Sequence, residues 1–327
     1  MQEFEPRKII SAPSSGTVEV VSSAPGKVIL FGEHAVVYGE PAISVAIARR
    51  LTVRLSEGDS APAIGGRMHR DKYTDAAFRA RGVEPRAVEV LSDIPVGCGL
   101  GSSAALCVAL HSAIPGPAGA LLEKGAIADA AFRSELEAQG RASPIDTSTS
   151  TLGGGLRLAR SKGPGHQWSI TRDDTVWHVH SIAMGGLPIV IGNTGRPAPT
   201  GEMVAMVRQR WDADEFVRRA VKRIGEISEE AVGALAKRDL RTLGELMNEN
   251  QGLLRRMGVD HPSTSKLLQA VRLHSLGAKI TGAGGGGSII SLTERPDEVI
   301  AALTEAGAKE VFLAAPDPDG VRVRRTG

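Results

Sequence analysis

The chain has 327 residues, which exceeds the size at which one hydrophobic core usually keeps growing, so two domains are expected. Hydrophobic residues make up 42% and charged residues 23% of the chain, as in folded globular proteins rather than disordered or fibrous ones. The formal net charge is only +2, which excludes a broad basic surface for nucleic acid or an anionic membrane. Any anion-binding site must therefore be local.

The two cysteines and the start of the chain indicate the compartment. Cys98 and Cys107 lack the partner pairs of a disulfide framework or a zinc site. The first 13 residues lack the hydrophobic region of a signal peptide, and no window is apolar enough to span a bilayer. We therefore expect a cytoplasmic protein that binds neither nucleic acid nor membrane.

Strands are expected to dominate the first ninety residues. Apolar residues alternate with polar ones at 51–56 and around 88–90, which indicates half-buried strands. The short apolar run 28–31 predicts another strand that ends at Gly32. The stretch from Ser56 to Arg70 is rich in Gly, Ala, Pro and charge, and it is interpreted as a surface loop.

Two helices are expected next. Good helix formers follow Ser102, and either Ser102 or Ser103 is placed to cap the first turn. The apolar spacing over 118–139 predicts a second helix, with Glu135 near its last turn and Gly140 just past its end. A glycine turn thus opens a buried helix.

The remaining chain alternates between strands and helices. Strands are expected at 156–160 and 187–191, and helices at 203–231. Two further helices are predicted to follow, then a strand and glycine loop pattern at 278–292 and a final helix around 299–303. We place the domain junction near Gly185, which divides the chain into 1–185 and 186–327 and makes the second part an α/β sandwich candidate.

A turn of glycines and serines directly precedes the helix that starts near Ser102. It comprises Gly97, Cys98, Gly99, Leu100, Gly101, Ser102 and Ser103. Glycines permit positive φ and close backbone approach, while free N–H groups and the helix dipole favour an anion such as phosphate. The alternative is a plain glycine turn that caps a helix. For an isolated glycine-rich stretch, that alternative is the commoner case.

Two familiar nucleotide motifs do not explain the glycines. The turn is not a Walker A loop, because no Lys-Ser or Lys-Thr follows its last glycine at the required spacing. Residues 282–287 match the Gly-x-Gly-x-x-Gly pattern, but only 40 residues remain after them, too few for a dinucleotide-binding sheet. So many glycines still indicate close approach to a ligand or another backbone.

Charged residues flank the predicted strand at 28–31. Lys27 lies at its start, and Glu33 and His34 follow it in loop positions, where functional residues concentrate. Taken singly, each is more simply a solvated lysine or a histidine bonded to backbone in a turn. Their joint occurrence favours a functional site.

Asp146 follows a proline and precedes five consecutive hydroxyl residues, a pattern we interpret as a loop that holds a carboxylate rigidly. If Asp146 meets Lys27, the ammonium stabilises the ionised carboxylate, which can still accept a proton from a substrate hydroxyl. The alternative is an aspartate in a turn hydrogen bond. Phosphoryl transfer requires donors around the phosphates, a carboxylate and a hydroxyl on Mg²⁺, and a cation near the transferred group. The sequence contains each of these.

Together, the segments around Lys27, Gly97–Ser103 and 279–287 resemble the three signature motifs of the GHMP small-molecule kinases, in order and from about residue 22 to the end. The segment Leu-Phe-Gly-Glu-His-Ala-Val-Val-Tyr-Gly is similar to that of the mevalonate kinase branch, and the length is similar to its compact archaeal members. The resemblance implies an α+β fold: a ribosomal-protein-like N-terminal domain, a ferredoxin-like C-terminal domain, and substrates in the cleft between them.

The resemblance also implies roles for individual residues. Gly97–Ser103 would wrap the ATP phosphates, and Ser103 and Glu135 would hold Mg²⁺. Asp146 would be the catalytic base, and Lys27 would assist it and the transferring phosphate. The implied reaction is ATP-dependent phosphorylation of the 5-hydroxyl of mevalonate, a step of isoprenoid synthesis, and relatives imply a homodimer.

The remaining matches carry less weight. His34 and Glu33 match positions that face mevalonate, and Thr200 matches a threonine near the reaction centre. The third motif, which would pack against the phosphate loop and close the site, includes Gly282, Ala283, Gly284 and Gly285. One departure is Ser143-Pro-Ile-Asp, where many members have Pro-Ser-Gly-x-Asp, so the backbone near the base is expected to differ.

Two rival functions follow from the same residues. A phosphomevalonate kinase of the same fold would need added basic residues beside His34, and the sequence has no such cluster there. A nucleotide-binding regulatory protein without catalysis would be expected to lack Asp146, Lys27 or a metal ligand, and all are present.

Overall fold

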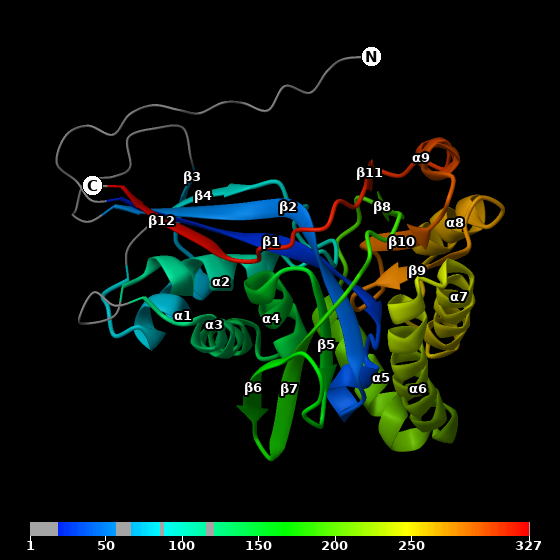
Figure 1. Cartoon of the computed structure of the whole chain (residues 1–327), viewed down its shortest axis with the longest axis horizontal. Helices are drawn as coiled ribbons and strands as arrows, with labels where there is room; N and C mark the ends of the chain where they lie inside the picture. Colours follow the sequence, from blue (N-terminus) through cyan, green and yellow to red (C-terminus); the bar gives the residue numbers. More distant parts are fainter. Residues whose placement is uncertain (1–18, 57–66, 86–87, 116–120, 327) are drawn as a thin grey trace.

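The computed structural model describes residues 19–56, 67–85, 88–115 and 121–326. These residues form two lobes, each an antiparallel sheet covered by helices (Figure 1). The larger lobe contains β1 (Glu19–Phe31), β2 (Ala42–Ser56), β3 (Arg67–His69), β4 (Val88–Ser92), β5 (Gly155–Ala159), β6 (His166–Arg172), β7 (Thr175–Ile182), β12 (Arg322–Thr326), α1 (Lys72–Ala80), α2 (Ser102–Ala113), α3 (Lys124–Gln139) and α4 (Pro144–Leu152). Its strands run in the order β12-β1-β2-β5-β7-β6, with β4 on β2 and β3 on β4.

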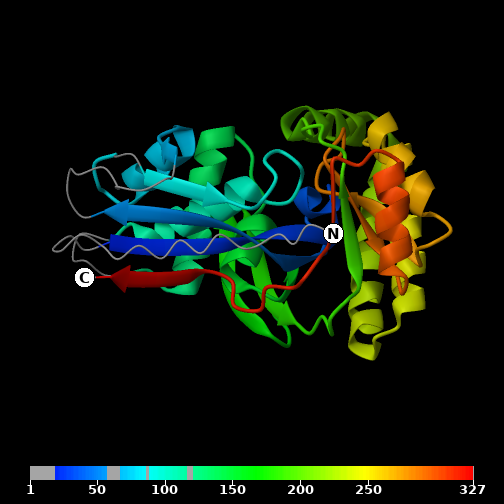
Figure 2. The same cartoon turned by 90° about the horizontal axis from the view of Figure 1, so that it is seen from above.

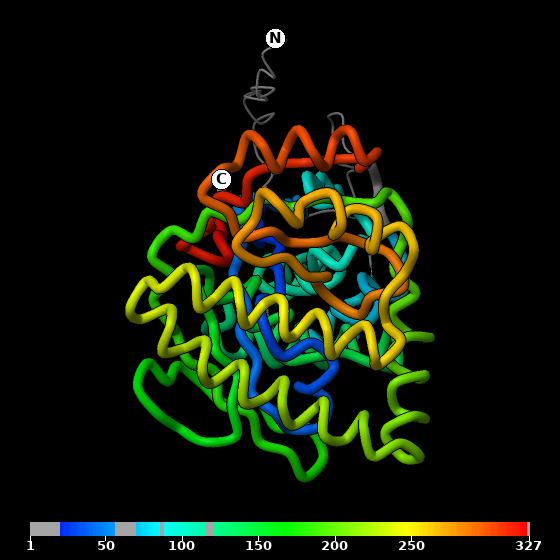
Figure 3. Tube along the Cα trace, turned by 90° about the vertical axis from the view of Figure 1, so that its right-hand side faces the viewer, coloured from blue at the N-terminus to red at the C-terminus, as the bar shows by residue number. Residues whose placement is uncertain are grey.

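The smaller lobe is built on a four-stranded sheet of order β11-β8-β10-β9. It contains β8 (Ile189–Asn193), β9 (Gly277–Thr281), β10 (Ser288–Leu292), β11 (Glu310–Leu313), α5 (Thr200–Ala213), α6 (Glu215–Lys237), α7 (Leu240–Arg256), α8 (Pro262–Val271) and α9 (Pro296–Glu305). Seen from the side of this lobe, α6 and α7 run side by side across it (Figure 3). Among the described residues, no helix is both long and apolar enough to cross a bilayer.

The core explains why these elements form. Helix α2 is mostly apolar, and its residues from Ala104 to Ala113 are all buried, as expected for a central helix. Both faces of the smaller sheet are buried, each in a different hydrophobic cluster. Ile191 and Ile290 join the core of the larger lobe, while Val190 and Ile289 pack in a second cluster with residues from the smaller lobe's helices. Apolar packing is therefore continuous between the lobes.

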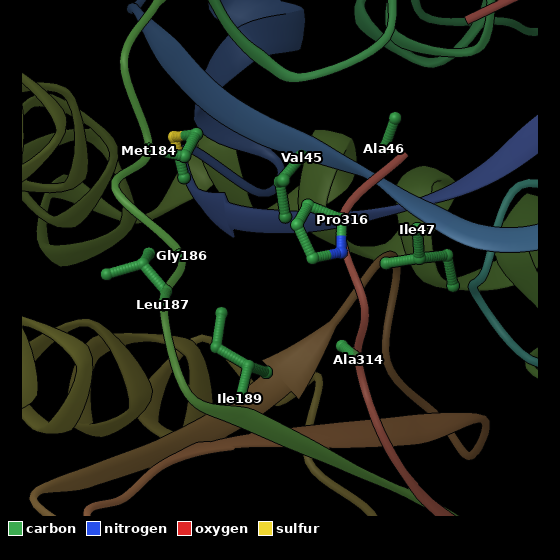
Figure 4. Close-up of a pocket in the computed structure, with 9 residues that line it drawn as sticks. All are labelled: Val45, Ala46, Ile47, Met184, Gly186, Leu187, Ile189, Ala314 and Pro316. Atoms are coloured by element: carbon green, nitrogen blue, oxygen red, sulfur yellow. The ribbon is translucent and has the colours of Figure 1, made fainter. Parts of the chain in front are cut away.

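Two chain segments connect the lobes. Residues 183–188 lead from β7 to β8, and residues 314–321 lead back to β12, which pairs with β1 (Figure 2). An apolar cavity lies between the two connections and includes none of the predicted site residues (Figure 4). The predicted boundary near Gly185 falls in the first connection. The return of β12 to the larger sheet is a feature that the sequence did not indicate.

Most predicted elements are present, with two corrections near the site. The N-cap of α2 is Gly101 in the left-handed conformation, and neither Ser102 nor Ser103 caps the helix. Asp146 lies in the first turn of α4 rather than in a loop, because Pro144 starts a helix and the hydroxyl residues after it are buried within it. The hydroxyl-rich sequence was misleading here, because the hydroxyls of Thr149 and Thr151 bond to carbonyls one turn back within the helix.

Three boundaries also differ from expectation. The helix predicted over 118–139 begins at Lys124, and residues 118–120 lie outside the described residues. The predicted surface loop Ser56–Arg70 lies partly outside them as well, and its described end includes strand β3. The helices predicted over 203–231 are α5 and α6, which meet at Asp214 and extend from Thr200 to Lys237.

Candidate active site

The glycine turn before α2 is folded onto Lys27 of β1. The backbone N–H of Lys27 donates to the carbonyl of Leu100 at 2.9 Å, and its ammonium lies 3.4 Å from the carbonyl oxygen of Gly99. A Cβ on Gly101 would lie 2.9 Å from Cγ of Lys27, and Gly101 has a φ of +78°. Only glycine fits there. The turn and the lysine are thus held as one unit.

Lys27 also forms an ion pair with Asp146 from the first turn of α4. Nζ of Lys27 lies 3.0 Å from Oδ1 of Asp146. The lysine side chain is only 3% exposed, whereas the carboxylate retains 24% of its surface. The pair therefore combines a buried cation with a carboxylate that a substrate can reach.

Ser103 and Glu135 lie beside this pair. The hydroxyl of Ser103, in the first turn of α2, donates to Oε1 of Glu135 on α3 at 2.6 Å. Burial, reinforced by the nearby charge of Asp146, raises the pKa of Glu135 to about 7. Its other oxygen, Oε2, is buried without a hydrogen-bond partner. A buried carboxylate with an orphan oxygen, next to a hydroxyl and a second carboxylate, fits a hard cation such as Mg²⁺.

The third glycine-rich motif packs directly on the glycine turn. A Cβ on Gly99 would lie 2.7 Å from the carbonyl oxygen of Thr281, and one on Gly282 would lie 3.2 Å from the Cα of Gly99. On its other side, a Cβ on Gly284 would lie 2.1 Å from the carbonyl oxygen of Val259. The loop is therefore confined between two backbones, and this explains its glycines without a dinucleotide site.

Glu33 and His34 lie in the turn after β1. Glu33 is 1% exposed and forms an ion pair with Lys279 of β9. The ring Nε2 of His34 lies 2.9 Å from the carbonyl oxygen of Ala283, so this nitrogen carries the proton and donates. Burial lowers the pKa of His34, which keeps the ring neutral. In this structure Glu33 therefore faces a lysine, and direct contact of Glu33 with a substrate stays a prediction.

Thr200 is the first residue of α5 and is exposed. The segment before it is joined to the glycine turn, since the N–H of Ala198 donates to the carbonyl of Gly97 at 2.8 Å. The guanidinium of Arg141, between α3 and α4, donates to the carbonyl of Gly201. The start of α5 is therefore linked to the larger lobe at two points.

Two residues of this region carried no sequence signal of their own. Lys279 is only the first residue of the third motif, and its pairing with Glu33 spans 246 positions of sequence. Arg141 is one of many arginines on the surface. No local pattern could have identified either contact.

Comparison with known proteins places this arrangement in a family. Models of the N-terminal and C-terminal domains of GHMP kinases match residues 69–154 and 231–309. A mevalonate kinase of Methanothermobacter thermautotrophicus is 38% identical over 284 residues, covering 83% of this chain and 89% of the relative. The chain belongs to the mevalonate kinases of the GHMP kinase family.

Other members of the mevalonate kinase family agree over nearly the whole chain. The mevalonate kinase of Pyrococcus horikoshii is 36% identical over 327 residues, covering 88% of this chain and 93% of the relative. The crystal structure of L. major mevalonate kinase in complex with R-mevalonate superposes with a TM-score of 0.71 at 25% identity, covering 93% of this chain and 97% of that one. The GHMP kinase fold expected from the motifs is thus confirmed.

The departure from the usual GHMP kinase motif before Asp146 is accommodated locally. Pro144 occupies the start of α4, where its missing N–H costs no helical hydrogen bond and its fixed φ suits the first turn. The helix therefore still begins directly before Asp146. Asp146 keeps its ion pair with Lys27.

Proposed function

We propose that this chain is a mevalonate kinase, which transfers the γ-phosphoryl group of ATP to the 5-hydroxyl of mevalonate. The observation that carries the proposal is the Lys27–Asp146 pair, which lies beside the backbone of a glycine turn at the start of a buried helix. Membership of the mevalonate kinase family supports the choice of alcohol.

Asp146 would act as the base. As the 5-hydroxyl oxygen attacks the γ-phosphorus and the bond to the β-phosphate oxygen of ATP breaks, the hydroxyl proton passes to the carboxylate. The product is the 5-phosphomonoester, and ADP leaves. The accessible face of Asp146 suits this exchange, because a fully buried carboxylate could not meet the alcohol.

Lys27 and the glycine turn would supply positive charge where the phosphates lie. The N–H groups at the start of α2 have no side-chain cap, which leaves them for an anion. The ammonium of Lys27 is fixed between Asp146 and the carbonyl of Gly99. A preorganised cation of this kind stabilises negative charge on the transferring group at little reorganisation cost.

Glu135 and Ser103 would hold Mg²⁺, as the orphan Oε2 of Glu135 and the adjacent hydroxyl support. When bound, the ion neutralises charge on the ATP phosphates. Glu135 must be ionised for this role, and its raised pKa makes that condition sensitive to pH. His34 and Thr200 are also proposed to contact mevalonate. A homodimer and a cytoplasmic location are likewise proposals.

The test is a coupled ADP-release assay with purified protein, ATP, Mg²⁺ and, separately, mevalonate, phosphomevalonate, galactose and homoserine. We expect turnover with mevalonate well above that with the other three. Turnover with phosphomevalonate alone would identify the rival kinase of the same fold. No alcohol-dependent turnover would favour the regulatory protein and contradict the proposal.

A further inference from the structure

The end of β1 and the end of β9 are joined by side-chain contacts between the lobes. The ammonium of Lys279 on β9 pairs with Oε1 of Glu33 in the turn after β1. Two residues further along β9, the hydroxyl of Thr281 accepts from the N–H of Ile29 at 2.9 Å and lies 3.2 Å from its carbonyl oxygen. These contacts connect residues about 250 positions apart, from two different sheets.

The Glu33–Lys279 pair is sealed from solvent. The two side chains are 1% and 0% exposed, and the ammonium also donates to the carbonyl of Ile280 at 2.8 Å. Burial alone raises the pKa of Glu33 and lowers that of Lys279, and each charge opposes that shift in the other. A buried ion pair often stabilises a fold no better than apolar residues of the same volume. Stability is therefore a weak reason for its presence.

The pair has a clear positional consequence. The turn that carries Glu33 enters the smaller lobe, where Ala35 belongs to the cluster packed against the lobe's helices. Within that turn His34 has a φ of +60°, which a non-glycine residue adopts only when its surroundings hold it there. Its ring reaches the third motif at Ala283. Glu33 is the adjacent residue, so the ion pair fixes one end of this strained segment.

We infer that Lys279 is a positioning residue: through its buried pair with Glu33 it sets the register between the lobes and thereby the place of His34 in the substrate site. The inference rests on the proposed function for its kinetic consequence. It assigns Glu33 an indirect role, through His34, in place of a direct contact with mevalonate. The two residues act as one unit.

The test is a double-mutant cycle on Lys279→Met, Glu33→Gln and the double variant, with Glu89→Gln as matched control. Glu89 is a carboxylate only 3% exposed that pairs with Arg54 within the larger lobe. Each variant is assayed for the KM of mevalonate, the KM of ATP and the midpoint of thermal unfolding. Hydrogen exchange of the amides in 282–287 is measured without substrate.

We expect each single substitution to raise the KM for mevalonate about tenfold with little change in that for ATP, and the double variant to be no worse than the poorer single one. Removing both charges together should restore much of the thermal stability while the KM stays high. Glu89→Gln should lower stability alone.

Three kinetic results would overturn the inference: an unchanged KM for mevalonate in Lys279→Met, single effects that multiply in the double variant, or a KM that recovers together with stability in the double variant. If Lys279→Met does not fold, an unchanged KM for mevalonate in Glu33→Gln or in the double variant overturns the inference instead. Faster exchange at 282–287 in the double variant is expected whether or not mevalonate is the substrate. Unaltered exchange would contradict the positioning role even if the wild type proved to phosphorylate another alcohol.

Discussion

Two buried lysines, Lys27 and Lys279, pair with carboxylates in this chain, and the pairs differ in what their carboxylates face. Asp146, the partner of Lys27, keeps 24% of its side chain exposed, while Glu33, the partner of Lys279, keeps 1%. The first pair lies within the larger lobe beside the glycine turn, and the second joins the two lobes.

The difference in exposure indicates different roles for the two lysine–carboxylate pairs. A carboxylate that must take a proton from an alcohol has to be reachable, and Asp146 is. A sealed pair cannot meet a substrate, but it is costly to break, because removing one partner leaves an uncompensated buried charge. The accessible pair therefore suits chemistry, and the sealed pair suits the placement of the lobes.

The largest expected effect is on stability at the sealed pair. Lys279→Met should lower the free energy of unfolding by about 3–5 kcal/mol, because Glu33 remains buried without a partner. Lys27→Met should cost clearly less, since water can reach Asp146. Urea denaturation of both variants measures the difference. Equal losses would remove the distinction between the two pairs.

The next effect is on turnover at the accessible pair. Asp146→Asn should lower kcat by about 10² or more while nucleotide binding stays nearly intact, because the base is lost and the glycine turn is not. Steady-state kinetics and a titration with a fluorescent ATP analogue check the two parts. Asp129→Asn, in an exposed pair with Arg133, serves as control. A variant that keeps full turnover would exclude Asp146 as base.

A moderate effect is expected from pH at Glu135. Its pKa of about 7 lies above the ordinary 4.5, so the folded state holds more protons between these values, and metal-free stability should fall as pH rises from about 4.5 to about 7. Mg²⁺ binds the ionised form, so at pH 6 its apparent affinity should be about tenfold weaker than well above pH 7. Thermal unfolding with and without Mg²⁺ tests both trends.

Glu135→Gln is the matching variant, because it keeps the shape of the side chain and removes the titration. It should abolish the pH dependence of the Mg²⁺ effect. The same Mg²⁺ stabilisation at pH 6 and pH 8 in the unaltered chain would show that Glu135 does not hold the ion.

The smallest effect is expected at an exposed contact between the lobes. Arg141 is exposed and reaches the carbonyl of Gly201 at the start of α5. Arg141→Ala should raise the KM for mevalonate by no more than about fivefold, since an exposed hydrogen bond is worth about 1 kcal/mol. The KM for mevalonate of this variant is measured under the conditions used for the double-mutant cycle on Lys279 and Glu33, so that the values can be compared. A rise in KM as large as that of Lys279→Met would show that burial does not decide which contact fixes the register between the lobes.

Local patterns in the sequence predicted most of the elements. Residues close together in the chain predict the buried helix α2 after Gly101. They also predict the end of helix α3 at Gly140. The glycine turn and Lys27 could be singled out for the same reason. From the sequence, contact between Lys27 and Asp146 was only one possibility, and the structure shows their ion pair.

Features that depend on distant partners were missed or misplaced. Ser102 or Ser103 was expected to cap the helix, but its N-cap is Gly101. The hydroxyl of Ser103 instead bonds to Glu135, 32 positions away, the residue with which the family resemblance pairs it. The hydroxyls after Asp146 indicated a loop, but tertiary burial makes them a helix. Strand β12 pairs with β1, and Lys279 pairs with Glu33, so both contacts join distant parts of the chain. Periodicity and spacing carry no information on such contacts.

The most direct measurement is ³¹P NMR of the products formed by the purified chain from ATP, Mg²⁺ and mevalonate. The account predicts ADP together with a phosphomonoester whose phosphorus couples to the C5 methylene protons of mevalonate. The account would be contradicted if ADP formed with inorganic phosphate alone. It would also be contradicted by a new phosphomonoester whose phosphorus does not couple to the C5 methylene protons of mevalonate.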